Sequence, residues 1–240
     1  MEKREEAELR LFDSGEERSS ALADYILQIS EISVMARGSF SLVLSGDIPK
    51  RLRKLTTPAY MKMLEHNWSK WHVFWAEENV VANNRHPDSL YRQANEAFIS
   101  KVPVLPEHVV RVLQGTPGEE AANRYEFSIR QQVRNRTVAA SPSNDCPRFD
   151  LIILTPESAG HLNHPMLEEE ESSSQWVAYV KSPNERVVLT IPVINSAANV
   201  VIVADYSSLQ AMRGRNPPAQ MVKPKDGKLV WFVDKGVDSL

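Results

Sequence analysis

Apolar residues recur at three- and four-residue spacing between Ser14 and Met35, which places them on one face of a helix. Ser14 followed by Glu17 has the pattern of a capping box, in which the two side chains satisfy free N–H groups of the first turn. The sequence therefore predicts an amphipathic helix over residues 14–35. Two further helices are predicted, over residues 88–98 and over residues 117–136, because each follows a residue that favours a helix start.

Short apolar runs lie between and after these helices. The runs most typical of buried strands are residues 39–44, 71–76, 149–154 and 199–204, and further candidates are residues 175–180, 186–191 and 229–233. Near-continuous apolar strands that alternate with helices indicate a mostly parallel sheet covered by helices on both faces. We therefore expect one α/β, Rossmann-like domain over residues 14–240, preceded by a flexible N-terminal segment over residues 1–13.

The composition supports a globular domain and narrows its partners. The 240 residues are 42% hydrophobic and 25% charged, which allows a large buried core. The net charge is −3 and the basic residues are scattered, so no cationic surface for nucleic acid is implied. The single cysteine, Cys146, excludes an internal disulfide, and no segment has the length of a membrane span. We expect a cytoplasmic protein, because the first residues match no secretory signal or transit peptide.

Ligands of open parallel sheets bind beyond the carboxyl ends of the strands, so the turns after the predicted strands form the candidate site. These turns are residues 45–47, 77–79, 155–161 and 205–207. The chain has no dinucleotide-binding G-x-G-x-x-G, no Walker lysine loop, no H-E-x-x-H and no G-x-S-x-G. Common cofactor chemistry therefore has no support in the sequence.

Six segments resemble the 6-phosphogluconolactonase family, and its plant members in particular. They are residues 38–46, 71–81, 88–91, 137–141, 147–152 and 192–200, and they occur in the family's order. The resemblance implies a fold shared with glucosamine-6-phosphate deaminases and ribose-5-phosphate isomerases. It also implies a hydrolase that opens 6-phosphogluconolactone to 6-phosphogluconate in the oxidative pentose phosphate pathway, without a metal or an organic cofactor.

The same resemblance assigns roles to five residues. His161 aligns with the histidine that removes a proton from water, so that hydroxide attacks the lactone carbonyl. Ser45, Gly46, Gly160 and Arg186 match substrate-binding positions, with Arg186 as a cation for the phosphate. The implied partner is a small sugar-phosphate lactone, with no nucleic acid, membrane or metal, and a monomer is expected.

Several positions depart from the family pattern. Ala159 replaces the aspartate two residues before the histidine, which predicts that the imidazole of His161 lacks an orienting carboxylate. Asp47 replaces a glycine and brings a negative charge to a turn that would receive phosphate. Asn79 and Leu209 replace an arginine and a lysine, so two cations of the family site are missing.

These departures leave other hypotheses open. One is a catalytically weakened homologue that binds a sugar phosphate or a protein partner without turnover. Another is a sugar-phosphate isomerase or deaminase on the same fold, although the matching segments favour the lactonase branch. His161, His164 and Glu168 also have a loosely metal-like arrangement, but acidic runs near histidines are common in solvated loops.

Overall fold

The computed structural model describes residues 7–161, 175–181, 184–208 and 221–235. The α-helices are α1 Gly15–Arg37, α2 Ile48–Arg51, α3 Pro58–Met63, α4 Leu90–Ala97, α5 Gly118–Arg134, α6 Pro156–His161 and α8 Ile191–Ile194. Short 3-10 helices are η1 Arg53–Thr56, η2 Trp68–Lys70, η3 Ile99–Lys101 and η4 Pro106–His108. The strands are β1 Glu8–Phe12, β2 Phe40–Leu44, β3 Trp71–Trp75, β4 Glu77–Asn79, β5 Ala139–Ala140, β6 Pro147–Arg148, β7 Leu151–Leu154, β8 Val177–Val180, β9 Arg186–Leu189, β10 Asn199–Asp205 and β11 Lys228–Asp234.

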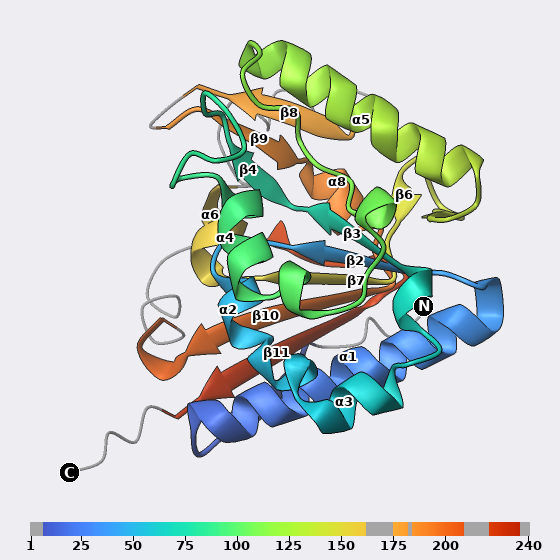
Figure 1. Cartoon of the computed structure of the whole chain (residues 1–240), viewed down its shortest axis with the longest axis vertical. Coiled ribbons are helices and arrows are strands. Elements are labelled where there is room, and N and C mark those ends of the chain that lie inside the picture. Colours follow the sequence, from blue (N-terminus) through green and yellow to red (C-terminus); the bar gives the residue numbers. More distant parts are fainter. Residues whose placement is uncertain (1–6, 162–174, 182–183, 209–220, 236–240) are drawn as a thin grey trace.

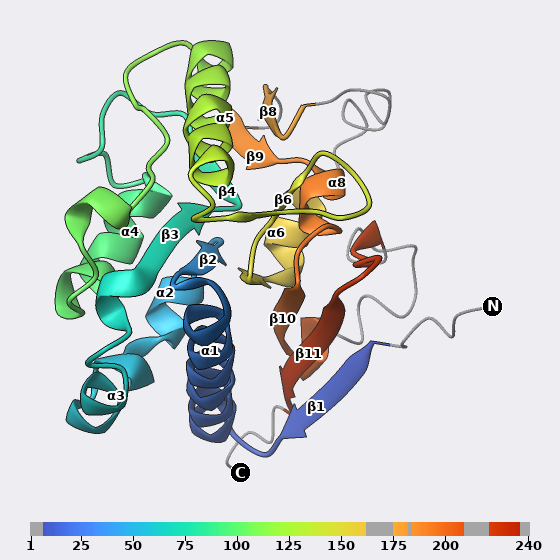
Figure 2. The same ribbon diagram turned by 90° about the vertical axis from the view of Figure 1, so that its right-hand side faces the viewer.

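A six-stranded sheet in the order β1-β11-β10-β7-β2-β3 forms the centre of the molecule (Figure 1). All neighbouring strands in this sheet run parallel. Its central strands β2 and β7 are buried at every position, in keeping with their near-continuous apolar sequences, which only Ser41 interrupts. Figure 2 shows helices α1, α2 and α3 on one side of the sheet and α6 on the other. The predicted α/β class with a mostly parallel sheet is confirmed.

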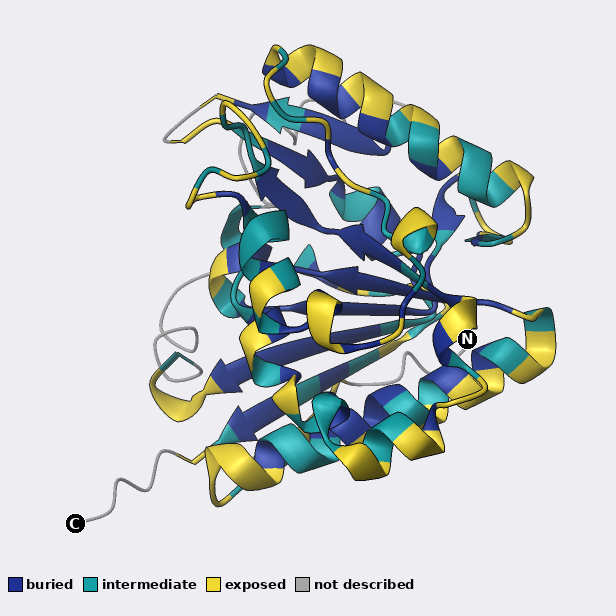
Figure 3. Ribbon diagram, viewed as in Figure 1, coloured by how far each residue is buried: buried dark blue, intermediate teal, exposed yellow. Residues whose placement is uncertain are grey.

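Exposed residues lie on the outer surfaces of α1, α3 and α5, whereas the strands between the helices are almost entirely buried (Figure 3). None of the helices in the described parts of the chain is both long enough and apolar enough to cross a lipid bilayer.

A second, three-stranded sheet lies beside the first, in the order β4-β9-β8, and its strands are antiparallel. Two of its strands were predicted, but the third, β4, has the polar sequence Glu77-Glu78-Asn79 and carries no hydrophobic signal. β4 follows β3 after one residue, so the chain passes from one sheet into the other at Ala76. This crossing point carries Glu77 and Glu78 into the interior, where both are buried.

The N-terminal segment differs from the expectation. Residues 1–13 were assigned to a flexible segment, whereas Glu8–Phe12 form β1, the edge strand that pairs with β11. The guanidinium of Arg10 lies over the rings of Tyr25 and Phe232, which ties this charged strand to α1 and β11. The strand alternates charged and apolar residues over only four positions, and its two leucines, Leu9 and Leu11, are exposed rather than directed into the core.

The helix predictions are correct in place and shifted by a few residues at the ends. The Ser14 hydroxyl accepts a hydrogen bond from the backbone N–H of Glu17, as the capping pattern predicts. The second predicted helix begins at Leu90 with Ser89, rather than Asp88, as its N-cap. The third ends at Arg134, close to the predicted end.

Candidate active site

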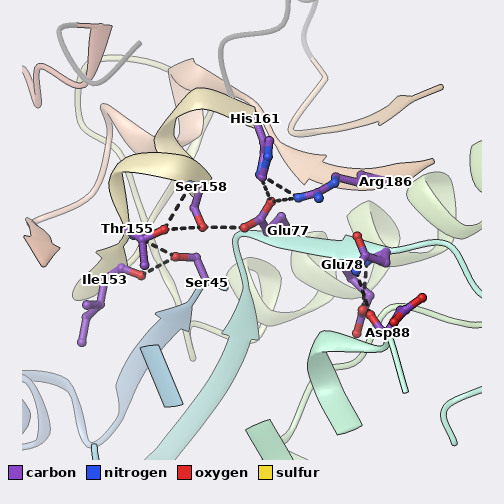
Figure 4. A network of polar contacts seen from close by, with 10 residues as sticks. Ser45, Glu77, Glu78, Asp88, Ile153, Thr155, Ser158, His161 and Arg186 are labelled. Atoms are coloured by element: carbon purple, nitrogen blue, oxygen red, sulfur yellow. Dashed lines mark hydrogen bonds and ion pairs between the residues drawn. The ribbon is translucent and has the colours of Figure 1, made fainter. Parts of the chain in front are cut away.

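Four parts of the fold meet at one end of the parallel sheet. They are the turn after β2, strand β4, helix α6 after β7, and the start of β9 (Figure 4). The turns after β2 and β7 are adjacent because these two strands pair in register. β4 and β9 pair so that Asn79 lies opposite Arg186, which brings the start of β9 toward the same end. The fold therefore assembles segments that are far apart in the sequence, as expected at the carboxyl ends of parallel strands.

Glu77 lies at the centre of this site and contacts three other side chains. Its Oε2 atom is 2.8 Å from Nδ1 of His161 and accepts a hydrogen bond from Nη1 of Arg186 at 2.8 Å. Its Oε1 atom accepts a hydrogen bond from the Ser158 hydroxyl at 2.5 Å. The Glu77 side chain is 2% exposed, so these contacts take the place of water around its charge.

The charge state of Glu77 follows from these contacts. Burial alone raises the pKa of the Glu77 carboxyl, but hydrogen bonds from His161 and Ser158 and the charges of His161 and Arg186 outweigh burial. The pKa of this carboxyl is therefore held below its ordinary value. Glu77 is a carboxylate at neutral pH.

Two groups with opposite requirements face Nδ1 of His161, a carboxylate that accepts and a guanidinium that donates. Nδ1 lies 2.8 Å from Oε2 of Glu77 and 2.6 Å from Nη1 of Arg186. Oε2 of Glu77 favours a proton on Nδ1, whereas the Arg186 guanidinium, which can only donate, favours a lone pair there; the reaction proposed below uses the tautomer with the proton on Nδ1. In this tautomer Nε2 keeps its lone pair. The His161 side chain is 37% exposed, so the ring reaches solvent and its Nε2 is suited to accept a proton from water.

This arrangement corrects one expectation. The replacement of the family's aspartate by Ala159 was expected to leave His161 without an orienting carboxylate, and Ala159 is buried with no polar group to offer. Glu77 from β4 supplies the carboxylate instead, at Nδ1 of the ring. Residues 77–79 were predicted to form a turn at the candidate site, and Glu77 was assigned no role. Its position directly after a buried strand was the available signal.

Helix α6 places Ser158 and His161 on the Glu77 side of the site. Thr155 precedes the helix, and its hydroxyl accepts a hydrogen bond from the backbone N–H of Ser158 at 3.1 Å, as an N-cap residue does. Pro156 occupies the first helical position, which its fixed φ favours. Ser158 and His161 are three residues apart and therefore lie on the same side of the helix. Sequence reasoning missed Ser158 and Thr155 because neither belongs to the family pattern.

The remaining predicted binding residues have separate places. The Ser45 hydroxyl donates to the carbonyl of Ile153 at 3.1 Å and accepts from the N–H of Thr155 at 3.3 Å, so it joins the ends of β2 and β7. Gly46 has φ +43°, and a Cβ atom there would lie 3.0 Å from the Ser158 hydroxyl and 3.8 Å from Oε1 of Glu77. Gly160 lies within α6 and is half-buried. The structure thus brings Gly46, His161 and Arg186 together around Glu77, whereas Ser45 has a structural contact below them.

The positions that depart from the family pattern also have partners. Asp47 forms an ion pair with Arg51 one helical turn later, at 3.0 Å, and 45% of its side chain is exposed. Asn79 donates from its side-chain amide to the carbonyl of Asp88, so it fastens the loop before α4. Leu209, His164 and Glu168 lie outside the described residues. Among the residues that are described, no group of three or more His, Cys, Asp or Glu side chains is placed to hold a metal ion.

The neighbouring Glu78 points away from His161, toward the start of α4 (Figure 4). Its carboxyl accepts hydrogen bonds from the backbone N–H groups of Asn79, Leu90 and Tyr91 and from the Ser89 hydroxyl. Burial nevertheless raises the pKa of Glu78 to about 7. Glu78 fastens a helix start and faces no cation in these contacts.

Comparison with known proteins decides the family. A family model described as glucosamine-6-phosphate isomerases/6-phosphogluconolactonase matches residues 13–231. The chain belongs to this family. A relative named probable 6-phosphogluconolactonase 1 of Oryza sativa subsp. japonica is 45% identical over 95% of this chain and 82% of its own length. One of the same name from Arabidopsis thaliana is 44% identical over 98% of this chain and 94% of its own length. The resemblance stated from the sequence is confirmed.

Solved structures of the family share the fold. The 6-phosphogluconolactonase of Thermotoga maritima has a TM-score of 0.73 at 23% identity and covers 96% of this chain and 100% of its own. A monomeric glucosamine-6-phosphate deaminase has a TM-score of 0.66 at 14% identity and covers 95% of this chain and 97% of its own. The expectation that lactonases and deaminases share this fold is therefore confirmed at the level of architecture.

Proposed function

We propose that this protein is a 6-phosphogluconolactonase, which hydrolyses 6-phosphoglucono-1,5-lactone to 6-phosphogluconate. The observation that carries the proposal is the contact of Nδ1 of His161 with the buried carboxylate of Glu77 at 2.8 Å. It supplies the element that a histidine base needs and that the departure at Ala159 had removed. The high identity to plant relatives named as probable 6-phosphogluconolactonases supports the substrate.

In the proposed reaction His161 acts as the general base. Nε2 removes a proton from water while hydroxide forms a bond to the lactone carbonyl carbon. The imidazolium that results is stabilised by Glu77, which already accepts from Nδ1. The same proton is returned to the ring oxygen when the bond between that oxygen and the carbonyl carbon breaks. No metal takes part in these steps.

Arg186 has two roles in the proposed reaction. Its Nη1 atom holds Glu77, and the guanidinium carries further N–H donors with which it can meet the substrate's phosphate. Gly46 leaves the turn after β2 free of a side chain beside Glu77. Ser45 and Gly160 remain candidates for backbone contacts with the substrate.

The test is a lactonase assay with freshly prepared 6-phosphogluconolactone, measured against the spontaneous rate in the same buffer. We expect the protein to raise the rate well above that background and His161→Ala to lower kcat/KM by at least roughly a hundredfold. His66→Ala is the matched control, because 90% of that side chain is exposed and it lies outside the site. A wild-type rate equal to the buffer rate would rule out the proposed function.

A second candidate function is a homologue that binds sugar phosphate without turnover. The specific observation is that the cations near the site already face carboxylates, Arg186 facing Glu77 and Arg51 facing Asp47. Calorimetric titration with 6-phosphogluconate separates the two candidates. Binding of the product without any acceleration of lactone opening favours the second, and acceleration above background excludes it.

A further inference from the structure

We propose that Ser158, supported by Thr155, is a positioning residue that holds Glu77 as an oriented carboxylate behind His161. The inference deepens the proposed function and rests on it for the role of His161. Both residues lie in the turn 155–161, and the sequence assigned no role to either side chain. Their contacts in the structure give them a common purpose.

Two hydrogen bonds connect Thr155, Ser158 and Glu77, and both run in the same direction. The Thr155 hydroxyl donates to the Ser158 hydroxyl at 3.1 Å, and the Ser158 hydroxyl donates to Oε1 of Glu77 at 2.5 Å. Each hydroxyl has a single proton, and an ionised carboxylate can only accept. The direction of the whole chain is therefore fixed from Thr155 toward Glu77 as long as Glu77 is charged.

The three residues are also buried. Thr155, Ser158 and Glu77 are 4%, 1% and 2% exposed, so water cannot readily replace a hydroxyl that is removed from this chain. A hydrogen bond to a charged group is stronger than a neutral one, and losing it leaves a buried oxygen without its donor. Ser158 is therefore the group that satisfies Oε1, while Arg186 and His161 satisfy Oε2.

The Ser158 hydroxyl also needs space beside Glu77. Gly46 belongs to the turn after β2, and a Cβ atom at this position would lie only 3.0 Å from the Ser158 hydroxyl. The absence of a side chain at Gly46 thus leaves room for this hydroxyl beside Glu77. The N-cap bond from the Ser158 N–H to the Thr155 hydroxyl fixes the same turn of α6 from below.

Loss of the Ser158 hydrogen bond is expected to change both the charge and the orientation of the Glu77 carboxyl. The charged or titratable groups described as facing Glu77 are His161 from α6 and Arg186 from β9. The Ser158 hydrogen bond is one of the contacts that lower the pKa of the Glu77 carboxyl, so this pKa is expected to rise when the donor is removed. Oε1 is left without its donor, and the carboxylate is no longer held in one orientation behind His161.

The experiment follows the carboxyl carbon of Glu77 by NMR during a pH titration of protein labelled with ¹³C-glutamate. The Glu77 signal is identified by its loss in Glu77→Gln. We expect Ser158→Ala to raise the titration midpoint by about one pH unit, Thr155→Val to raise it less, and Ser158→Thr to restore it nearly to wild type. Ser128→Ala is the matched control, because its hydroxyl donates only to the Arg124 carbonyl on the exposed face of α5.

Activity gives an independent readout. In Ser158→Ala kcat/KM is expected to fall roughly tenfold near neutral pH, and Ser158→Thr is expected to restore it. If Ser158→Ala does not fold, Ser158→Cys and Thr155→Val take its place, since both keep a side chain of similar size. A midpoint equal to wild type in the folded Ser158 variant, or in both replacements, overturns the inference. An inactive wild-type protein would overturn the proposed function, while the Glu77 titration would still decide the role of Ser158.

Discussion

Glu77 and Glu78 are neighbours on β4, both are almost completely buried, and their pKa values move in opposite directions. The pKa of Glu77 is lowered by its contacts with His161, Ser158 and Arg186, whereas burial raises the pKa of Glu78 to about 7. Glu78 has more backbone donors, but Glu77 faces two side chains that can carry positive charge. Side-chain hydrogen bonds from His161 and Ser158, together with the facing charges of His161 and Arg186, separate the carboxylate beside the base from the carboxyl that fastens a helix.

Removing the negative charge of Glu77 is expected to have the largest effect on catalysis. Glu77→Gln should lower kcat/KM for lactone hydrolysis by roughly a hundredfold to a thousandfold, because a neutral amide neither fixes the tautomer of His161 nor stabilises the imidazolium. The measurement is the rate above the spontaneous background. Glu78→Gln is the matched control and should stay within roughly threefold of wild type, since Glu78 has no contact with His161. Equal losses in the two variants would contradict the comparison.

The ion pair that lowers the pKa of Glu77 also contributes to stability. Arg186→Met keeps much of the side-chain volume and removes a cation from a carboxylate that is 2% exposed. We expect the free energy of unfolding to fall by about 3 kcal/mol, because a buried charge loses a partner. Urea denaturation at neutral pH measures this. The double variant Glu77→Gln with Arg186→Met should recover part of the loss, and no recovery would show that the two side chains are not coupled.

The pH dependence of stability separates the two carboxyls. The folded pKa of Glu78 lies above its ordinary value of 4.5, so the native protein binds more protons than the unfolded chain between about pH 4.5 and 7. Its contribution to stability is therefore present below this range and is lost as the pH rises through it, by about 3 kcal/mol. The effect of Glu77 on stability has the opposite sign. Its contribution to the free energy of unfolding is present above its ordinary pKa and is lost as the pH falls below that value.

Urea denaturation at pH 5 and pH 8 tests the Glu78 prediction. His72, whose pKa burial lowers to about 4, makes stability rise with pH in both proteins, so Glu78 is tested by the difference: from pH 5 to pH 8 wild type should lose about 3 kcal/mol relative to Glu78→Gln, because glutamine resembles the protonated carboxyl. Glu77→Gln should retain the wild-type slope in this range. If Glu78→Gln has the same dependence of the free energy of unfolding on pH as wild type, the effect belongs to another group. The contrast drawn between Glu77 and Glu78 would then be wrong.

An exposed acidic group is expected to give the smallest effect. Asp47 lies in the turn after β2 and pairs with Arg51, and nearly half of its side chain is exposed. Asp47→Gly should lower KM for the phosphorylated lactone by roughly threefold and leave kcat unchanged, because solvent screens its charge and Arg51 becomes available to an anion. Asp145→Gly is a control for the loss of one negative charge. A change in kcat would place Asp47 in the reaction rather than at its edge.

Much of the fold could be predicted from the sequence because its signals are local. The apolar runs at β2, β7 and β10 predict buried parallel strands, and Ser14 predicts the start of α1. The elements that were missed have weak local signals. β1 and β4 are short and carry charged residues, and their pairing with β11 and β9 depends on partners far along the chain.

The candidate site shows the same division. His161 and Arg186 were predicted from the sequence because their surroundings match a family pattern. The glycine at position 46 and the loss of the aspartate at Ala159 are also visible in the sequence. The position of Glu77 at Nδ1 of His161, in place of the missing carboxylate, and the hydrogen bond from Ser158 to Glu77 follow only from the folded arrangement. The physical reason is distance along the chain: the contacts of Glu77 join residues 81, 84 and 109 positions apart, and no local pattern can specify such contacts before the sheet is formed.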